Sequence, residues 1–144
     1  MTAFLNHDRY PLGHCRHHCL LYSFRKHYSA IVQYVQAHPE HEWIILSTVF
    51  DETVTWFRAK VSISASIEIG QLLREEHRYI HLSAEDDRAT WEALTRYNDK
   101  AWSYTDCSLL VMAQRLNTNK IASFDEHIRQ MRGLGIVCVP QPTG

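Results

Sequence analysis

Three acidic residues fall shortly after a predicted strand or at the start of a predicted helix, where a carboxylate can bind a metal ion. Glu52 comes one helical turn after an apolar run, Asp106 opens a helical stretch, and Asp125 follows a second apolar run almost at once. Ligands of open α/β sheets bind outside the carboxyl ends of the strands. Three carboxylates there repel one another unless a cation neutralises them, and hard oxygen ligands select Mg²⁺ or Mn²⁺. Such a site suits phosphodiester hydrolysis, because the metal generates a hydroxide nucleophile and stabilises charge on the phosphate.

Helix capping is the alternative interpretation of these acids. The segments 103–106 and 123–126 both approximate a capping box, and acids in a first helical turn complement the helix dipole. Asp51 lies at the other edge of the apolar stripe that flanks Glu52, and periodicity alone does not choose between the two. The metal interpretation therefore depends on the acids occurring together at several strand ends.

Strands and helices alternate along the chain from residue 28 onward. Helices are predicted at 28–36, 49–60, 62–75, 85–97, 105–116 and 125–132, and strands at 43–48, 79–82, 120–123 and 135–139. The run 43–48 is short, largely apolar and contains β-branched residues, which is typical of a strand buried on both faces. This order predicts an α/β domain with a parallel sheet.

Length and composition indicate one ordinary globular domain over residues 1–144. Hydrophobic residues make up 45% of the chain and charged residues 22%, and the net charge is -1. This balance excludes a disordered chain and gives no general affinity for nucleic acid, so any polyanion must be bound locally. No apolar stretch reaches the ~20 residues of a membrane helix, and the first residues lack the pattern of a secretory signal. We expect a cytoplasmic protein.

The segments around Asp106 and Asp125 also carry a family likeness. They read Trp102-Ser103-Tyr104-Thr105-Asp106-Cys107 and Ser123-Phe124-Asp125-Glu126-His127. Together they resemble the C-terminal half of a PIN domain, most of all the VapC-type toxins of bacterial toxin–antitoxin pairs. The segment 47–53 is similar to the second acidic motif of the family, with Glu52 in the place of the acid. The resemblance runs from about residue 27 to residue 140.

This resemblance implies a fold, an activity and a set of partners. The fold would be a three-layer α/β/α PIN-like domain with a small parallel sheet. The activity would be that of a Mg²⁺-dependent endoribonuclease that cleaves single-stranded RNA, the toxin of a type II toxin–antitoxin pair. Glu52, Asp106 and Asp125 would hold the metal or its waters, and Thr105 would help to position them. The family's toxins are usually homodimers held inactive by a cognate antitoxin protein.

The N-terminal segment, residues 1–26, departs from the family pattern. The family's first acid ends an N-terminal strand and is followed by Thr or Ser, and we find no such segment here. By its distance from the matching segment 27–30, the acid is expected near Gly13. The loss of one metal-binding acid predicts weaker Mg²⁺ binding and weaker transition-state stabilisation. A catalytically impaired PIN remnant that binds RNA or a protein partner is therefore the alternative function.

Histidine and cysteine are dense in the same segment, and two hypotheses address them. Seven of the ten histidines precede residue 42. A zinc-binding module would use His14, Cys15, His18 and Cys19, although ligands this close in sequence do not easily surround a tetrahedral ion. The second hypothesis is a reading-frame error: skipping the first base of the Gly13-His14-Cys15 codons can give Asp-Thr followed by Ala or Val, which restores the missing motif.

A nuclease that acts on single strands also needs cations and aromatic rings near its acids. The basic candidates are Arg58, Lys60, Lys100 and Arg115, and the aromatic candidates are Trp102 and Tyr104. For each of them a solvated helix face or a core anchor is the more common role of such a residue. His127 is interpreted as a surface histidine of a capped helix, with proton transfer as the alternative, and Cys107 and Cys138 as small core residues.

Overall fold

Five parallel strands form the sheet of this chain, whose computed structural model describes residues 17–21 and 28–141. They are β1 His17–Leu21, β2 His41–Leu46, β3 Arg78–Ile80, β4 Lys120–Ala122 and β5 Val137–Val139. Their order across the sheet is β3-β2-β1-β4-β5, so the first strand lies in the middle. In this register Leu20 pairs with Ile44 on one side and with Ile121 on the other.

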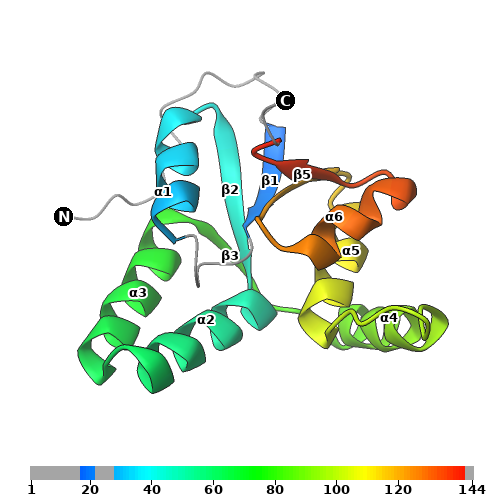
Figure 1. Ribbon diagram of the computed structural model, residues 1–144, viewed down its shortest axis with the longest axis horizontal. Coiled ribbons are helices and arrows are strands. Elements are labelled where there is room, and N and C mark those ends of the chain that lie inside the picture. Colours follow the sequence, from blue (N-terminus) through cyan, green and yellow to red (C-terminus); the bar gives the residue numbers. More distant parts are fainter. Residues whose placement is uncertain (1–16, 22–27, 142–144) are drawn as a thin grey trace.

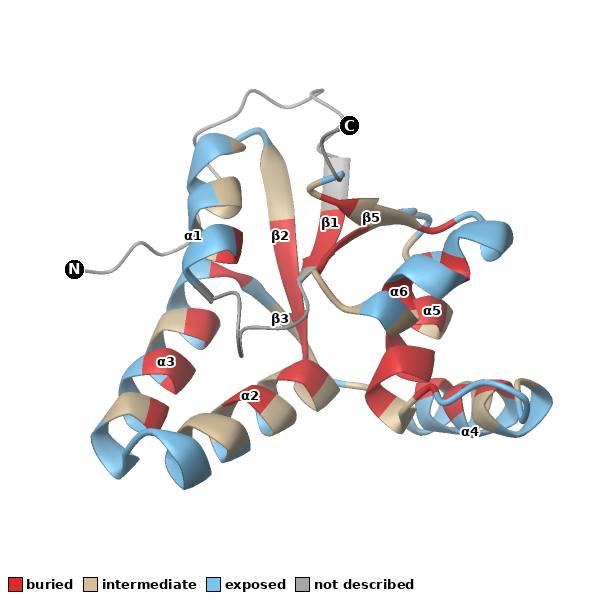
Figure 2. Ribbon diagram, viewed as in Figure 1, coloured by how far each residue is buried: buried red, intermediate tan, exposed pale blue. Residues whose placement is uncertain are grey.

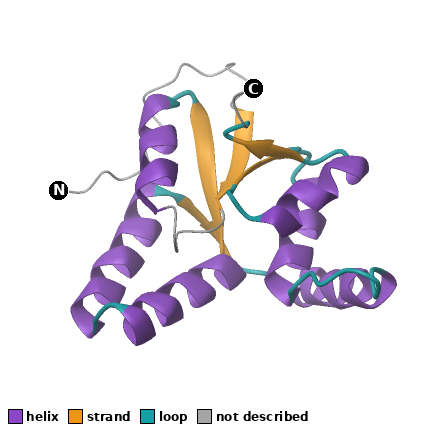
Figure 3. Cartoon of the chain, viewed as in Figure 1, coloured by secondary structure: helices purple, strands orange, loops and turns teal. Residues whose placement is uncertain are grey.

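Helices cover both faces of the sheet. They are α1 Tyr28–Ala37, α2 Ser47–Lys60, α3 Ile63–Glu76, α4 Ala84–Arg96, α5 Tyr104–Arg115 and α6 Glu126–Gln130, with a 3₁₀ helix at Met131–Leu134. Strands added in one direction from β1, and then in the other, place their right-handed connections on opposite faces. Figures 1 and 3 show α1, α2 and α3 on one side of the strands and α4, α5 and α6 on the other. The predicted three-layer α/β fold is confirmed.

The core lies along the central strands and the inner faces of the helices. Ile44, Ile45 and Leu46 are all fully buried, as expected for a strand covered by helices on both faces. Cys19 and Leu20 of β1 are buried with them. Figure 2 shows the buried residues concentrated on the strands and on the start of α5. No helix in the described part of the chain is long and apolar enough to cross a membrane.

Polar side chains define where the helices of the second layer begin. Ser103 and Asp106 form a reciprocal capping box at the start of α5, and Ser83 and Asp86 form the same device at α4. Each box pairs a serine hydroxyl and a carboxylate with backbone N–H groups that have no partner inside the helix. The capping box thus fixes Asp106 in the first turn of α5.

Strand β1 is the main difference from the sequence prediction, which placed no strand before residue 28. It ends at Leu21, and the next residues in the sequence are Tyr22 and Ser23. The position that follows the first strand is therefore occupied by tyrosine, and the expectation that it falls near Gly13 is wrong. Gly13 and its neighbours, on which the reading-frame hypothesis depends, lie outside the described residues.

Other boundaries differ from the predictions by a few residues. Strand β2 occupies 41–46 instead of 43–48, because α2 already begins at Ser47. The helix predicted at 125–132 is a short α6 that continues as the 3₁₀ helix. Strands β3 and β5 are shorter than predicted. None of these shifts moves a candidate acid to another face of the sheet.

The order of the strands reverses between β1 and β4. Chain connections lead from β1 to β2 and β3 in one direction, and from β4 to β5 in the other. Such a switch point leaves a crevice at the carboxyl ends of the two strands, because the following helices diverge to opposite faces. Asp125 follows β4 directly, and α5 begins beside it.

Candidate functional site

Asp106 is the most deeply buried of the candidate acids, with 1% of the residue exposed. Its Oδ2 atom accepts a hydrogen bond from the backbone N–H of Ser103 at 2.8 Å. The backbone N–H of Asp106 in turn donates to the Ser103 hydroxyl at 3.0 Å. Its other carboxylate oxygen, Oδ1, is buried and has no hydrogen-bond partner among the described residues. The capping interpretation is therefore correct for one oxygen and leaves the second unexplained.

Asp125 is joined to Asp106 through His127. Its Oδ1 atom accepts from the backbone N–H of His127 at 2.8 Å, which makes Asp125 the N-cap of α6. The His127 ring nitrogen Nδ1 lies 3.0 Å from Asp106 Oδ2 and 3.8 Å from Asp125 Oδ1. The structure thus brings two of the three predicted acids together. It also places His127 between them, which the interpretation as a surface histidine did not anticipate.

Glu52 lies on a neighbouring helix and is not part of this contact. It is half-buried, whereas Asp51 is exposed, which favours Glu52 of the two acids that periodicity left open. Thr48, one turn earlier on α2, shares a hydrogen bond of 2.8 Å with Ser108 of α5. The Ser108 hydroxyl donates to the backbone oxygen of Thr105 at 2.7 Å. This link holds the start of α2 against the first turn of α5.

A metal ion fits Asp106 and Asp125 better than it fits the full predicted set. Among residues 17–21 and 28–141, no three His, Cys, Asp or Glu side chains lie close enough together to hold one ion. A buried carboxylate oxygen without a partner is costly, however, and a cation is the ligand that would satisfy it. Asp106 Oδ1 is such an oxygen, and Asp125 supplies a second carboxylate, which approaches the same His127 ring as Asp106. The donor set is all oxygen, which suits Mg²⁺ or Mn²⁺.

Comparison with known proteins shows the family and the fold of this chain. The family model of the PIN domain matches residues 19–134. The chain belongs to the PIN-domain family. The fold is similar to the crystal structure of Mycobacterium tuberculosis VapC20, a Sarcin-Ricin loop cleaving toxin, with a TM-score of 0.70 and 16% identity over 83% of this chain and 96% of that chain. No curated protein matches the sequence significantly.

The zinc hypothesis loses one of its ligands in this PIN domain. Cys19 lies in the central strand, is fully buried in the hydrophobic core, and burial raises its thiol pKa to about 12. A thiol must lose its proton to bind zinc, so this environment opposes coordination. His14 and Cys15 lie outside the described residues.

Three of the predicted RNA contacts of the PIN domain have structural roles instead. Trp102 is 5% exposed, and its indole N–H donates to Gln130 Oε1 at 2.9 Å. The Tyr104 hydroxyl donates to the Asp87 carboxylate; burial, together with this carboxylate, raises the tyrosine pKa to about 12. Arg115 forms an ion pair with the buried Asp86.

The remaining basic candidates lie at the surface, and the two cysteines lie in the core or at its edge. Lys100 pairs with Asp99 at 3.6 Å, and Arg58 is exposed on α2. Lys60 lines a cavity together with Glu52. Cys107 is fully buried, as predicted, whereas Cys138 is half-buried and its thiol donates to the backbone oxygen of Ser123 at 2.9 Å.

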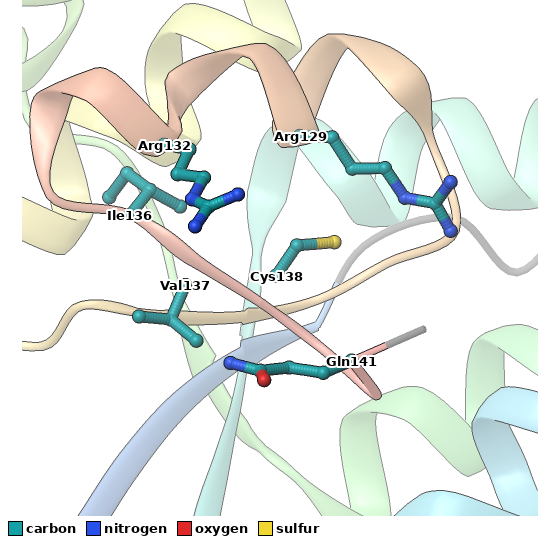
Figure 4. A pocket seen from close by; sticks show the side chains of 6 residues that line it. All are labelled: Arg129, Arg132, Ile136, Val137, Cys138 and Gln141. Carbon is teal, nitrogen blue, oxygen red and sulfur yellow. The ribbon is translucent and has the colours of Figure 1, made fainter. Parts of the chain in front are cut away.

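Sequence reasoning missed a basic surface formed by Arg129 and Arg132, which follow Asp125 in the chain. Arg129 and Arg132 line a cavity of about 330 Å³ beside β5. Figure 4 shows their guanidinium groups on either side of Cys138, with Gln141 facing them across the strand. Arg129 lies one helical turn after Asp125 on α6. Both arginines are visible in the sequence of the segment 126–134. However, α6 is only five residues long, so no helical periodicity predicts that the two side chains line one cavity.

Proposed function

We propose that this PIN domain is a divalent-metal-dependent endoribonuclease that cleaves single-stranded RNA, and that it is the toxin of a toxin–antitoxin pair. The observation that carries the proposal is the buried, unpartnered Oδ1 atom of Asp106, held next to Asp125 at the switch point of a parallel sheet. A cation would satisfy a carboxylate oxygen in that state. Mg²⁺, with Mn²⁺ as a substitute, is the expected cofactor.

Each residue of the site has a role in this proposal. Asp106 and Asp125 hold the metal ion or its waters, with Glu52 approaching from α2. When bound, Mg²⁺ supplies a hydroxide nucleophile and stabilises the negative charge on the phosphate. Thr105 and the Ser103 cap position the Asp106 carboxylate, and His127 orients it relative to Asp125. Precise orientation matters because a small displacement of a ligand costs much of the rate.

The positive charge needed for RNA lies on both sides of the acids. Arg129 and Arg132 stand beyond Asp125, and Lys60 lies on α2 beyond Glu52. Because the net charge is -1, the whole molecule does not attract RNA, and its phosphates must be bound by local cations such as these. Phosphate contacts supply most of the affinity of a non-specific complex. We further propose that an antitoxin protein inhibits the enzyme and that the enzyme acts as a homodimer, which follows from the resemblance to VapC-type toxins.

An RNA cleavage assay tests the proposed activity. The wild-type chain, Tyr22→Asp and Asp106→Asn are incubated with single-stranded RNA in Mg²⁺, in Mn²⁺ and in EDTA. Tyr22→Asp restores an acid at the position after β1 and is expected to cleave faster than the wild type, with Tyr22→Asn as the matched neutral control. Asp106→Asn is expected to lose roughly 100-fold or more of the metal-dependent rate.

The outcomes separate the proposal from its alternative. Metal-dependent cleavage that Asp106→Asn abolishes supports the nuclease. If neither the wild type nor Tyr22→Asp cleaves RNA in either metal, the nuclease proposal is rejected. RNA binding without cleavage would then favour a PIN remnant that acts as a binding module, an alternative that the tyrosine after β1 already supports.

A further inference from the structure

One face of α2 carries an acid, an aromatic ring and a cation at intervals of one helical turn. Glu52, Trp56 and Lys60 are four residues apart, so they follow one another along the same face with a rise of about 6 Å at each step. All three line one cavity of about 350 Å³. The candidate site residue Glu52 therefore shares a surface with groups of a different chemistry.

The packing of α2 leaves this face uncovered by its partner helix. Gly70 of α3 packs against Val54 and Phe50 of α2, on the side opposite to Glu52. Trp56 is half-buried, and its ring contacts Phe57 edge to face with a centroid distance of 5.3 Å. The indole is thus anchored at one edge and contributes to the wall of the cavity. An anchored aromatic ring loses little conformational entropy when a second ring stacks on it.

We propose that this cavity binds a nucleotide of the RNA strand next to the cleavage position, with its base stacked on Trp56 and a flanking phosphate paired with Lys60. The proposal rests on the proposed function, because Glu52 marks the end of the cavity nearest to the metal-binding acids. Single-stranded nucleic acid is held by such combinations of an aromatic platform and a nearby cation, without base-specific hydrogen bonds.

The order of the three groups sets the direction of the strand. Asp51 and Glu52 both line one end of the cavity and repel a phosphate, whereas Lys60 at the other end attracts it, so the uncharged base takes the position between them. Glu52 and Lys60 are eight residues apart, or about 12 Å along the helix. The strand therefore runs along α2, away from the acids and toward the α2–α3 turn, where Figure 1 shows α2 leading away from the sheet.

Binding measured in EDTA tests this assignment separately from cleavage. A fluorescein-labelled, single-stranded RNA of eight nucleotides is titrated with the full chain, and the anisotropy gives the Kd. Trp56→Leu is expected to weaken binding on the order of tenfold, the usual effect of losing one stacked base, and Trp56→Phe to retain most of the affinity. Lys60→Gln is expected to weaken binding and to reduce the salt dependence of the Kd by about one phosphate contact.

Matched controls distinguish stacking from a general surface effect. Trp91 is 59% exposed on α4, and Trp91→Leu should leave the Kd unchanged, as should Arg96→Gln on the same helix. An RNA whose bases are replaced by abasic sites should bind the wild type and Trp56→Leu equally. Circular dichroism and urea unfolding establish that each variant is folded, and Lys60→Gln keeps the inference falsifiable if Trp56→Leu does not fold.

Several outcomes overturn the inference. One is an unchanged Kd in Trp56→Leu, and another is a Trp56→Leu variant that loses as much affinity for abasic RNA as for normal RNA. A third is a wild-type chain that does not bind the RNA. A fourth is a loss of affinity that follows a change in oligomeric state measured by light scattering, which would make the cavity a contact between subunits. Stacking without metal-dependent cleavage would support the inference and reject the nuclease.

Discussion

The Asp106 carboxylate divides its two oxygens between a structural bond and an open position. Oδ2 accepts from the Ser103 backbone and lies 3.0 Å from the His127 ring, while Oδ1 is buried without a partner in the described chain. A carboxylate that only capped a helix would not need a second oxygen in that position. Helix capping and metal binding therefore predict different effects for substitutions at Ser103 and at Asp106.

Ser103→Ala removes the cap and leaves the Asp106 charge in place. We expect it to lower the free energy of unfolding by about 1 kcal/mol, the typical contribution of an N-cap side chain, and to retain stabilisation by Mg²⁺ or Mn²⁺. Asp106→Asn is expected to lose that stabilisation, since one negative charge is gone. Thermal unfolding with and without the metal measures both effects. Equal metal stabilisation of the wild type and Asp106→Asn would contradict a metal-binding role.

The acids of the site could be predicted from sequence more reliably than its other residues. Both Asp106 and Asp125 stand at the start of a helix, and Asp125 also follows the buried strand β4, and these features are local. The roles of Trp102 and His127 depend on Gln130 and Asp106, which lie 28 and 21 residues away in the chain. No pattern in the neighbourhood of either residue encodes those contacts. Sequence reasoning therefore kept Trp102 as a candidate RNA platform beside the core-anchor interpretation, and the structure shows it buried.

An ion pair between Arg115 and Asp86 joins α5 to α4. Arg115 Nη1 lies 2.5 Å from Asp86 Oδ2, and the Asp86 side chain is 4% exposed. Burial alone would raise the pKa of Asp86, but hydrogen bonds from Ser83 and the charge of Arg115 together lower it below its ordinary value. The carboxylate is therefore ionised and depends on these partners at neutral pH.

Arg115→Met removes the charge and keeps much of the apolar stem. We expect the free energy of unfolding to fall by roughly 1–2 kcal/mol, because the buried Asp86 carboxylate loses a partner but keeps its bonds to Ser83. The Kd for single-stranded RNA should not change, since the guanidinium is engaged between two helices. Urea unfolding and the anisotropy titration measure the two quantities. A large loss of RNA affinity in a stable Arg115→Met variant would restore Arg115 as an RNA contact.

Most elements were predictable because their signals are local. Helices α4 and α5 carry a capping serine and an apolar stripe, and β2 is a continuous apolar run. Strand β1 reads His17-His18-Cys19-Leu20-Leu21, which has no strong alternation and begins with two polar residues. Its place in the sheet comes from pairing with β2 and β4 on either side, and this information is distributed over the whole chain.

A buried histidine, His77, makes the stability of the fold depend on pH. His77 lies between α3 and β3 and is 9% exposed, and its Nδ1 atom has no hydrogen-bond partner within the described ranges. Burial lowers its pKa from 6.5 to about 4. The unfolded chain therefore binds a proton below about pH 6.5, whereas the folded chain does so only near pH 4.

The free energy of unfolding should consequently decrease as the pH falls from about 6.5 to about 4. The contribution of His77 to this decrease is roughly 3 kcal/mol, since each unit of pKa shift corresponds to about 1.4 kcal/mol. His77→Leu should flatten this part of the profile relative to the wild type. Urea denaturation at a series of pH values measures the difference. Parallel profiles for the two proteins would assign the acid sensitivity to other groups.

The central position of β1 determines when this protein can complete its fold. Leu20 pairs with Ile121, a contact that spans most of the chain, and Asp125 comes only after that strand. Pairings so distant in sequence form slowly, because a large loop must close before they contribute. Every residue up to Asp125 must therefore leave the ribosome before the two aspartates can meet. Translation itself thus delays the assembly of the acidic site until β4 and Asp125 have been synthesised.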